Sequence, residues 1–153
     1  MPTKKARAKP KARPRDAKLR SRAQRAASKP SNRIPALQHI PWDSIPLEEL
    51  NPLLRRQFVV GQRIMLARIL LKKGCIVPKH SHHNEQLSYI LEGALKFWID
   101  GREIVVSAGE MLCIPSNMPH KAEALADTVS LDVFCPPRSD WINKDDQYLR
   151  GTK

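Results

Sequence analysis

The sequence predicts an all-β domain, built as an antiparallel sandwich or barrel. Short apolar runs follow one another from residue 57 onwards with turn residues between them, and no segment shows a clear helical repeat. Asp100-Gly101 separates two of these runs and is a strong signal for a tight hairpin. The runs, each expected to form one strand, span residues 57–60, 63–71, 86–91, 94–99, 102–106, 110–114, 121–124 and 128–134.

Charge is distributed unevenly along the chain. Of the 27 Lys and Arg residues, 13 lie in residues 1–33 beside a single acid, Asp16. The remaining 120 residues hold 14 basic and 14 acidic residues, which cancel. The net charge of +12 therefore belongs to the N-terminal segment, and the rest of the chain gives no reason to expect nucleic acid at its surface.

Residues 1–33 form a tail of Lys, Arg, Ala and Pro in which Leu19 is the only large apolar residue. Such a segment buries too little surface to offset the entropy of ordering, so we expect it to be disordered. Two roles stay open for it. It is either a solvated extension, or an arm that binds nucleic acid weakly and without sequence preference, because each neutralised phosphate releases counterions.

The remaining chain is long enough for one hydrophobic core and too short for two. Residues 34–56 contain Pro35, Pro41, Pro46 and Pro52, which are incompatible with a central strand or a long helix, so this segment is predicted to be an extended lead-in. Residues 57–138 are predicted to form the barrel. Residues 139–153 are predicted to form a C-terminal extension, and its "INKDDQYLR" stretch is a candidate to clasp a second copy of the chain.

The cysteines indicate a reducing compartment. Cys75, Cys113 and Cys135 form no C-x-x-C pair and leave an odd thiol. No run approaches the roughly 18–20 apolar residues that span a bilayer, and the N-terminus lacks the apolar stretch of a secretory signal. We therefore expect a cytoplasmic protein without a membrane partner.

Two histidine-containing stretches predict a metal site. The first is Gly74-x5-His80-x-His82-x3-Gln86-x6-Gly93, and the second is Gly109-x5-Pro115-x-Asn117-x2-His120. On an extended strand, side chains two apart point the same way, so His80 and His82 present two imidazoles on one face. By the same alternation, Gln86 faces the metal while Glu85 and His83 face away. His120 must come from a distant strand, which requires a closed or folded-over sheet.

At these residues the chain resembles the cupin superfamily, whose two motifs are G-x5-H-x-H-x3,4-E-x6-G and G-x5-P-x-G-x2-H-x3-N. The departures are Gln86 for the usual Glu, Asn117 for the Gly of the second motif, and Ala124 for its closing Asn. The resemblance covers roughly residues 41–141. It implies a cupin double-stranded β-helix, also called a jelly-roll barrel, with one divalent metal ion held by His80, His82, Gln86 and His120. It also implies a homodimer, since cupins commonly pair through edge strands.

Gln86 together with the later stretch "LDVFCPPRSDW" is similar to a small single-domain group of cupins, the KdgF-like pectin-degradation type. That resemblance implies ring opening and ketonisation of a 4,5-unsaturated uronate, a small anionic sugar. Three imidazoles and an amide are neutral, so a bound cation keeps its full charge and attracts carboxylates. The metal itself, whether Ni, Zn, Mn or Fe, is not specified. An iron-dependent cupin dioxygenase and a non-catalytic metal-dependent sensor of sugars or small acids remain alternatives.

Three further residues are candidates for chemistry. Asp132 lies in "SLDVF" on the same strand face as Ser130 and Phe134. It either faces solvent on an edge strand or projects into the cavity as an acid/base. Arg138 follows a stiff Pro-Pro pair and is suited to hold a substrate carboxylate by two parallel hydrogen bonds. In KdgF-like cupins an Asp and an Arg six residues apart are implicated in catalysis, a spacing that Asp132 and Arg138 match. Arg68, among apolar neighbours, is a weaker candidate for substrate binding.

The organisation into a basic tail and a neutral domain is testable by truncation. Removing residues 1–33 should leave folding and metal binding intact, because residues 34–153 contain every proposed ligand. The same truncation should abolish any nucleic-acid affinity of the full chain, and that affinity should fall steeply with salt. Circular dichroism, metal content and filter binding at two salt concentrations measure these quantities. A truncated chain that loses its fold or its metal would contradict this organisation.

Overall fold

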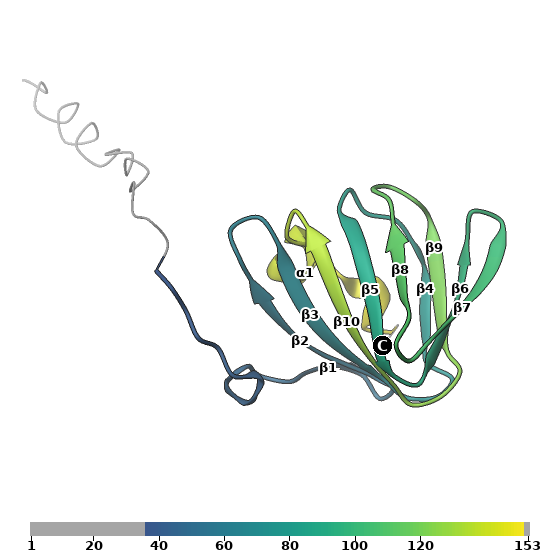
Figure 1. The fold of residues 1–153 in the computed structure, drawn as a ribbon, viewed down its shortest axis with the longest axis horizontal. Coiled ribbons are helices and arrows are strands. Elements are labelled where there is room, and N and C mark those ends of the chain that lie inside the picture. The colour runs from purple at the N-terminus through teal and green to yellow at the C-terminus, as the bar shows by residue number, and fades with distance from the viewer. Residues whose placement is uncertain (1–35, 152–153) are drawn as a thin grey trace, which may run out of the picture. The chain divides into compact units, whose positions relative to one another are not determined.

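The computed structural model of the protein describes residues 36–151 (Figure 1). The predicted tail of residues 1–33 lies outside these described residues. From His39 onwards the chain forms one compact unit. Within residues 36–151, no helix is both long and apolar enough to cross a bilayer.

Within the described residues 36–151, ten strands form two antiparallel sheets that face each other (Figure 1). The six-stranded sheet has the order β1-β2-β3-β10-β5-β8, and the four-stranded sheet has the order β4-β9-β6-β7. The strands are β1 Glu48–Asn51, β2 Leu54–Val60, β3 Met65–Leu71, β4 Ile76–His80, β5 Glu85–Glu92, β6 Ala94–Ile99, β7 Arg102–Ser107, β8 Met111–Ile114, β9 His120–Ala124 and β10 Thr128–Cys135.

The all-β prediction is confirmed, and each of the eight predicted runs overlaps one of the observed strands. Two strands were not predicted, β1 and β4. The lead-in of residues 34–56 is more ordered than expected, because it supplies β1 and the first part of β2 to the larger sheet. Its prolines do not prevent this. Pro46 and Pro52 lie on either side of β1, and β1 is an edge strand.

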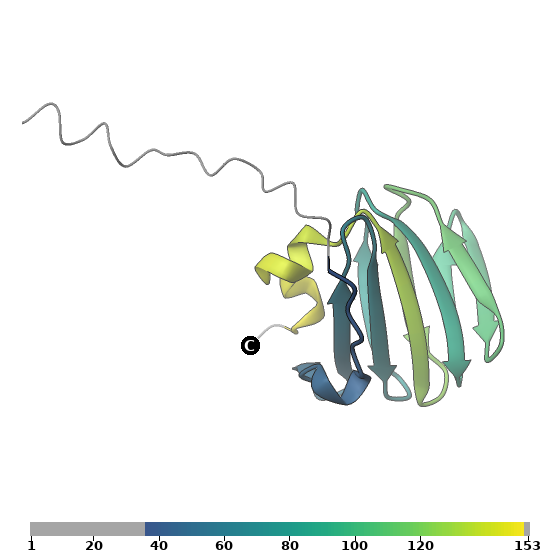
Figure 2. The ribbon, with the colours of Figure 1, turned by 60° about the vertical axis from the view of Figure 1, so that its left-hand side comes forward.

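The core lies between the two sheets, where side chains alternate strictly. On β3, Met65, Ala67, Ile69 and Leu71 are buried while the residues between them are half-buried. On β6, the same alternation buries one apolar face against the larger sheet. Figure 2 shows the strands of the larger sheet running side by side over this core. The buried residues of β6 are Leu95, Phe97 and Ile99.

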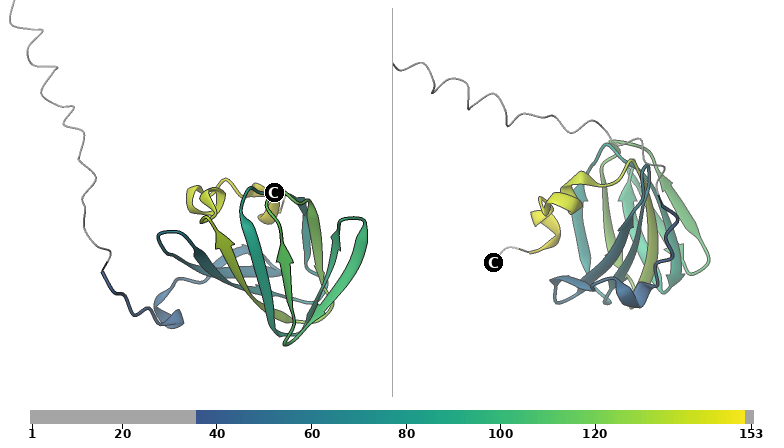
Figure 3. Two further views of the ribbon diagram at one scale, coloured as in Figure 1. Left: turned by 45° about the horizontal axis from the view of Figure 1, so that its top comes forward. Right: turned by 90° about the vertical axis from the view of Figure 1, so that its left-hand side faces the viewer.

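The C-terminal segment contacts both sheets instead of extending away from the domain. It contains the α-helix α1 (Ser139–Asn143) and the 3-10 helix η2 (Gln147–Leu149). The other 3-10 helix of the described residues, η1 (Trp42–Ser44), lies in the lead-in. Asn51 Nδ2 on β1 donates to the carbonyl oxygen of Leu149 at 2.8 Å, while Tyr148 stacks on His80 of β4. Figures 2 and 3 show α1 and the turns after it along one side of the barrel. The candidate clasp for a second chain therefore packs on its own domain.

A buried network of charges fixes this segment to the larger sheet. Arg56 and Asp146 are both fully buried, and Arg56 Nη2 lies 2.6 Å from Asp146 Oδ2, close enough for an ion pair but outside hydrogen-bond geometry. Arg56 Nε donates to Glu48 Oε2 at 3.0 Å. Arg150 donates to both acids, at 2.9 Å to Asp146 Oδ1 and 2.6 Å to Glu48 Oε1. Two arginines thus balance two carboxylates where unpaired charges would be costly.

Trp141 connects this network to the interior of the barrel. Its indole ring lies 4.4 Å from the guanidinium carbon of Arg56 and 4.9 Å from that of Arg138. The ring also meets Phe134 edge-on, with ring centroids 5.0 Å apart. Both cations are therefore placed against an aromatic ring, an arrangement that stabilises buried guanidinium groups.

The buried network predicts an asymmetry between two neighbouring acids. Asp146→Ala leaves part of the Arg56 charge unpaired in the interior, so the free energy of unfolding should fall by about 3 kcal/mol. Asp145→Ala removes an exposed acid from the same turn and should change it by less than about 0.5 kcal/mol. Urea unfolding of both variants measures the difference. Equal stability of the two would show that the network does not anchor the segment.

Candidate metal centre

Three histidines from two distant parts of the chain meet inside the barrel. His80 ends β4 and is paired directly with His120, which begins β9. His82 lies two residues beyond β4, in the connection to β5. The ring centroids of His80 and His120 are 4.3 Å apart, and that of His82 is 5.6 Å and 5.3 Å from them. One ligand atom from each of the three lies within 4.8 Å of the others.

Backbone carbonyls fix the proton on each ring. The Nδ1 atoms lie at 2.8 Å from the carbonyl oxygen of Pro78 for His80, 3.0 Å from that of Asn84 for His82, and 2.8 Å from that of Met118 for His120. A carbonyl oxygen only accepts, so Nδ1 must carry the proton in each neutral ring. The Nε2 lone pairs of all three histidines are then free to bind a cation. Histidines that bind metal ions are commonly oriented in this way, by a hydrogen bond from the ring nitrogen that faces away from the metal.

The surroundings keep these rings neutral. Burial lowers the pKa of His80 and of His82 to about 4, with the charge of His120 adding to the effect at His80 and that of Arg138 at His82. Burial also lowers the pKa of His120. At neutral pH the three rings therefore present lone pairs rather than positive charge, as metal ligation requires.

Gln86 on β5 adds an oxygen to the cluster. Its Oε1 lies 3.1 Å from His82 Nε2, and its Nε2 donates to Ser88 Oγ at 2.9 Å and towards Asp132 Oδ2 at 3.4 Å. These two acceptors fix the orientation of the amide. Oε1 and the lone pair of His82 Nε2 then face each other. Two acceptors at this distance repel each other, and a cation that binds both of them removes this repulsion. The neutral set of three nitrogens and one oxygen therefore fits a divalent metal ion.

The side chains next to Gln86 in the sequence point in the directions that strand alternation predicted. Gln86 is buried, whereas Glu85 and His83 are exposed. The bend at residues 83–84 interrupts the strand, yet β5 begins in the phase that turns Gln86 inward. Asn117, where cupins carry Gly, has a φ of +63°, and its N–H donates to the carbonyl oxygen of His82 at 2.7 Å. Asn tolerates this left-handed conformation better than most residues, which explains the departure.

Asp132 lies inside the pocket next to the histidines. Its strand, β10, is central in the larger sheet, so the alternative of an exposed edge position is wrong. Ser130 Oγ donates to Asp132 Oδ1 at 2.7 Å. Burial raises the pKa of Asp132, and hydrogen bonds from Ser130 and Ser88 and the charge of Arg138 oppose that shift. A carboxyl group with a raised pKa in a pocket is suited to exchange protons with a ligand.

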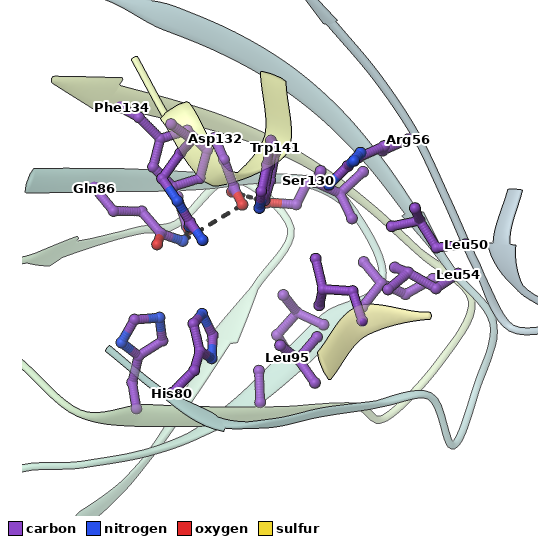
Figure 4. A pocket seen from close by; sticks show the side chains of 18 of the residues that line it. Leu50, Leu54, Arg56, His80, Gln86, Leu95, Ser130, Asp132, Phe134 and Trp141 are labelled. Atoms are coloured by element: carbon purple, nitrogen blue, oxygen red, sulfur yellow. Dashed lines mark hydrogen bonds between the residues drawn. The ribbon is translucent and has the colours of Figure 1, made fainter. Parts of the chain in front are cut away.

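The pocket has a polar end and an apolar end (Figure 4). Gln86, Asp132 and Ser130 lie along one wall, and His80 faces them across the space. Leucines close the other end. The empty space, its mouth included, is about 570 Å³, within the range of small-molecule sites. The apolar residues of the pocket are Leu50, Leu54, Ile69, Leu71, Val77, Leu95, Phe97, Ala122 and Leu149, with the aromatic rings of Phe134 and Trp141.

Arg138 is buried at the pocket and not on the surface, but its expected role needs a correction. Its Nε and Nη2 donate to Asp140 Oδ1 and Oδ2 at 2.9 and 2.6 Å, and Nη2 also donates to Tyr148 Oη at 2.7 Å. The two parallel hydrogen bonds predicted for a substrate carboxylate are thus made to Asp140. Nη1 has no hydrogen-bond partner among the described residues. It is the end of the guanidinium that remains for a ligand.

Arg68 does not belong to the site. On β3 it lies between the buried residues Ala67 and Ile69, on the opposite, outer face of the sheet, and it does not line the pocket. In the sequence Arg68 has apolar residues on both sides. In the structure the residues of β3 alternate between the inner and the outer face of the sheet, and Arg68 falls on the outer face. The predicted substrate contact of Arg68 is therefore wrong.

Sequence reasoning missed several residues of the pocket. Ser88 has the parity of Gln86 on β5, so alternation was a signal that identifies it. Trp141 and Tyr148 gave no such signal, because they reach the pocket from the C-terminal segment through contacts that no local pattern specifies.

The fold and the site together define a class of protein, a small antiparallel β-barrel with an inward-facing cluster of three histidines that could hold a metal ion. Residues 67–135 match the cupin domain family. This part of the chain is a cupin domain, as the motifs predicted.

Among known proteins, the chain is similar to the pectin degradation protein KdgF of Dickeya dadantii, with 26% identity over 103 residues that cover 65% of this chain and 94% of the relative. The structure of KdgF from a Halomonas species has a TM-score of 0.61 at 24% identity, covers 65% of this chain and 94% of its own, and shows the fold alone. An RmlC-like cupin from Shewanella frigidimarina has a TM-score of 0.65 at 26% identity, covering 69% and 96%.

The placement of the histidines predicts which residues hold a metal ion. His82→Ala should abolish stoichiometric metal, because it removes one of the four proposed ligand atoms. His83→Ala and Glu85→Ala should retain it, since both side chains are exposed and point away. Metal content after equilibration and gel filtration, measured by mass spectrometry, tests the three variants. Equal loss of metal from all three would refute the assignment.

Proposed function

We propose that this cupin is a metal-dependent enzyme that opens the ring of a 4,5-unsaturated uronate monosaccharide and converts it into its linear keto form. The observation that carries the proposal is the position of Asp132, a buried acid with a raised pKa that lines one pocket with Gln86 and with two histidines of the cluster, His80 and His120. The similarity to a pectin degradation protein supports the choice of substrate class.

The charge of the site favours an anionic ligand. His80, His82, His120 and Gln86 are neutral, and the charge of Arg138 acts on this cluster and on Asp132. A divalent ion held by the four neutral groups would supply a Lewis acid with its full formal charge, suited to polarise a carbonyl or hydroxyl oxygen. Arg138 would contact the carboxylate of the sugar through Nη1, while Asp140 holds the rest of the guanidinium in place.

The proposed reaction is an isomerisation that needs no co-reactant. The bond between C1 and the ring oxygen breaks, and the 1-hydroxyl gives up its proton to become part of an aldehyde. The ring oxygen becomes an enol hydroxyl, and the enol becomes a ketone when C4 gains a proton and the enol oxygen loses one. Each proton that is removed is matched by one that is delivered. A single group that accepts and returns protons therefore suffices for the reaction.

Asp132 is the residue in the pocket best suited to move these protons. Its raised pKa brings the carboxyl closer to neutrality than an exposed aspartate, which improves both acceptance and return of a proton. Ser130 and Gln86 hold one oxygen each, so the carboxyl keeps its orientation. The apolar end of the pocket limits water around the carboxyl and strengthens the electrostatic interactions of the site.

Replacing this acid tests the proposal. Asp132→Asn keeps the shape, and the Ser130 hydroxyl is able to reverse its role and accept from the new amide. Turnover of an unsaturated uronate, followed by loss of its ultraviolet absorbance, should fall by roughly 10² or more because the proton carrier is gone. Metal content and folding should persist. Asp145→Asn, which changes an exposed acid, is the matched control and should keep full activity.

Two outcomes would contradict the proposal. Full turnover by the Asp132→Asn variant would show that the acid carries no proton. Absence of turnover by the unaltered, metal-loaded protein, together with tight binding of a saturated uronate, would identify a binding protein instead of an enzyme.

A further inference from the structure

The C-terminal segment supplies one wall of the pocket from outside the part of the chain that matches the cupin family. That match ends at residue 135, whereas Arg138, Trp141, Tyr148 and Leu149 all line the pocket. The segment is held by the buried pair of Arg56 and Asp146 and by Arg150 on Glu48, described above. Its position against the barrel is therefore fixed by charge pairing, in which Arg56 also lines the pocket.

Tyr148 is the residue of this segment that reaches the histidines. Its ring stacks on the imidazole of His80, with centroids 4.6 Å apart and planes at 29°. Its hydroxyl oxygen accepts a hydrogen bond from Arg138 Nη2 at 2.7 Å. The guanidinium is itself locked by Asp140, so both the ring and the oxygen of Tyr148 are held by neighbours.

The hydroxyl proton of Tyr148 is not used within the domain. Among residues 36–151, the Tyr148 oxygen accepts from Arg138 Nη2, and the indole N–H of Trp141 acts on the same oxygen as a second donor, whereas the hydroxyl proton meets no acceptor. A phenol is protonated at neutral pH and carries one O–H donor. This proton prefers the plane of the ring and has two positions there. Because Arg138 and Trp141 both act on this oxygen as donors, neither is able to accept the proton, which remains available to a ligand.

We infer that Tyr148 donates this hydrogen bond to an oxygen of the bound ligand, so that the C-terminal segment contributes a ligand-contacting residue to the cupin site. The inference rests on the proposed function for the class of ligand, an oxygen-rich uronate. Arg138 and Tyr148 then form a pair of donors fixed to one another. Together they recognise an anionic group and an oxygen next to it.

Galacturonate is a suitable probe because it is a uronate without the double bond and is therefore not converted. Calorimetry with zinc-loaded full-length protein should show roughly tenfold weaker galacturonate binding for Tyr148→Phe, which keeps the stacked ring and removes only the hydroxyl. Its zinc content should equal that of the parent. Tyr89→Phe is the matched control, because Tyr89 is half-buried on the outer face of β5, and binding should be unchanged.

The Tyr89→Phe control also provides a direct view of Tyr148. The chain has two tyrosines, so this variant holds a single one. With carbon-13 at the hydroxyl-bearing ring carbon, its one resonance should shift when galacturonate is added to the zinc-loaded protein. This measurement needs neither activity nor a substitution at Tyr148, so it decides the question even if Tyr148→Phe is poorly folded.

The outcomes separate this inference from the proposed function. A resonance that does not move at saturating galacturonate, or unchanged binding by Tyr148→Phe, would overturn the role of Tyr148 even if the protein converts unsaturated uronates. A parent protein that does not bind galacturonate would overturn it as well. A shifted resonance in a protein without turnover would support the role of Tyr148 and refute the enzymatic proposal.

Discussion

The pocket depends on one constraint, that each polar group inside a small barrel must have a partner. The three histidine Nδ1 atoms meet backbone carbonyls, Asp132 meets Ser130, and the Gln86 amide meets Ser88. Once these partners are assigned, the remaining groups are determined. Around the histidine cluster they are the Nε2 lone pairs, Gln86 Oε1, the Nη1 end of Arg138 and the hydroxyl proton of Tyr148. The groups without a protein partner thereby mark where a metal ion and a ligand would bind.

The buried arginines outside the histidine cluster also have partners. Arg56 and Arg138 both lie over the ring of Trp141, and each is paired with carboxylates supplied by β1 or by the C-terminal segment. A buried guanidinium without such partners would cost several kcal/mol. The consequence for the site is that Arg138 is positioned before any ligand arrives. Little entropy is then lost when a carboxylate meets its free nitrogen.

Much of the fold and of the metal centre was predictable because both rest on local patterns. Strand alternation separated Gln86 from Glu85 and placed Asp132 on the strand face of Ser130 and Phe134, and motif spacing predicted that His120 joins the other histidines. β4 was missed since its "IVPKH" sequence has no clean alternation and contains a proline. Arg68 was misassigned because the burial of its face depends on which sheet covers β3. The partner of Arg138 and the place of Tyr148 come from tertiary contacts that leave no trace in spacing.

The central position of β10 limits how the sequence can change in length. This strand pairs along its whole length with β3 on one side and β5 on the other, and its alternate residues Ser130, Asp132 and Phe134 face the pocket. Deleting or inserting one residue here would exchange the inner and outer faces of everything beyond that point. The exposed hairpin turn at Asp100-Gly101 has no such restriction. Substitutions in β10 would alter the chemistry of the pocket one side chain at a time, whereas insertions and deletions would be tolerated only in the loops.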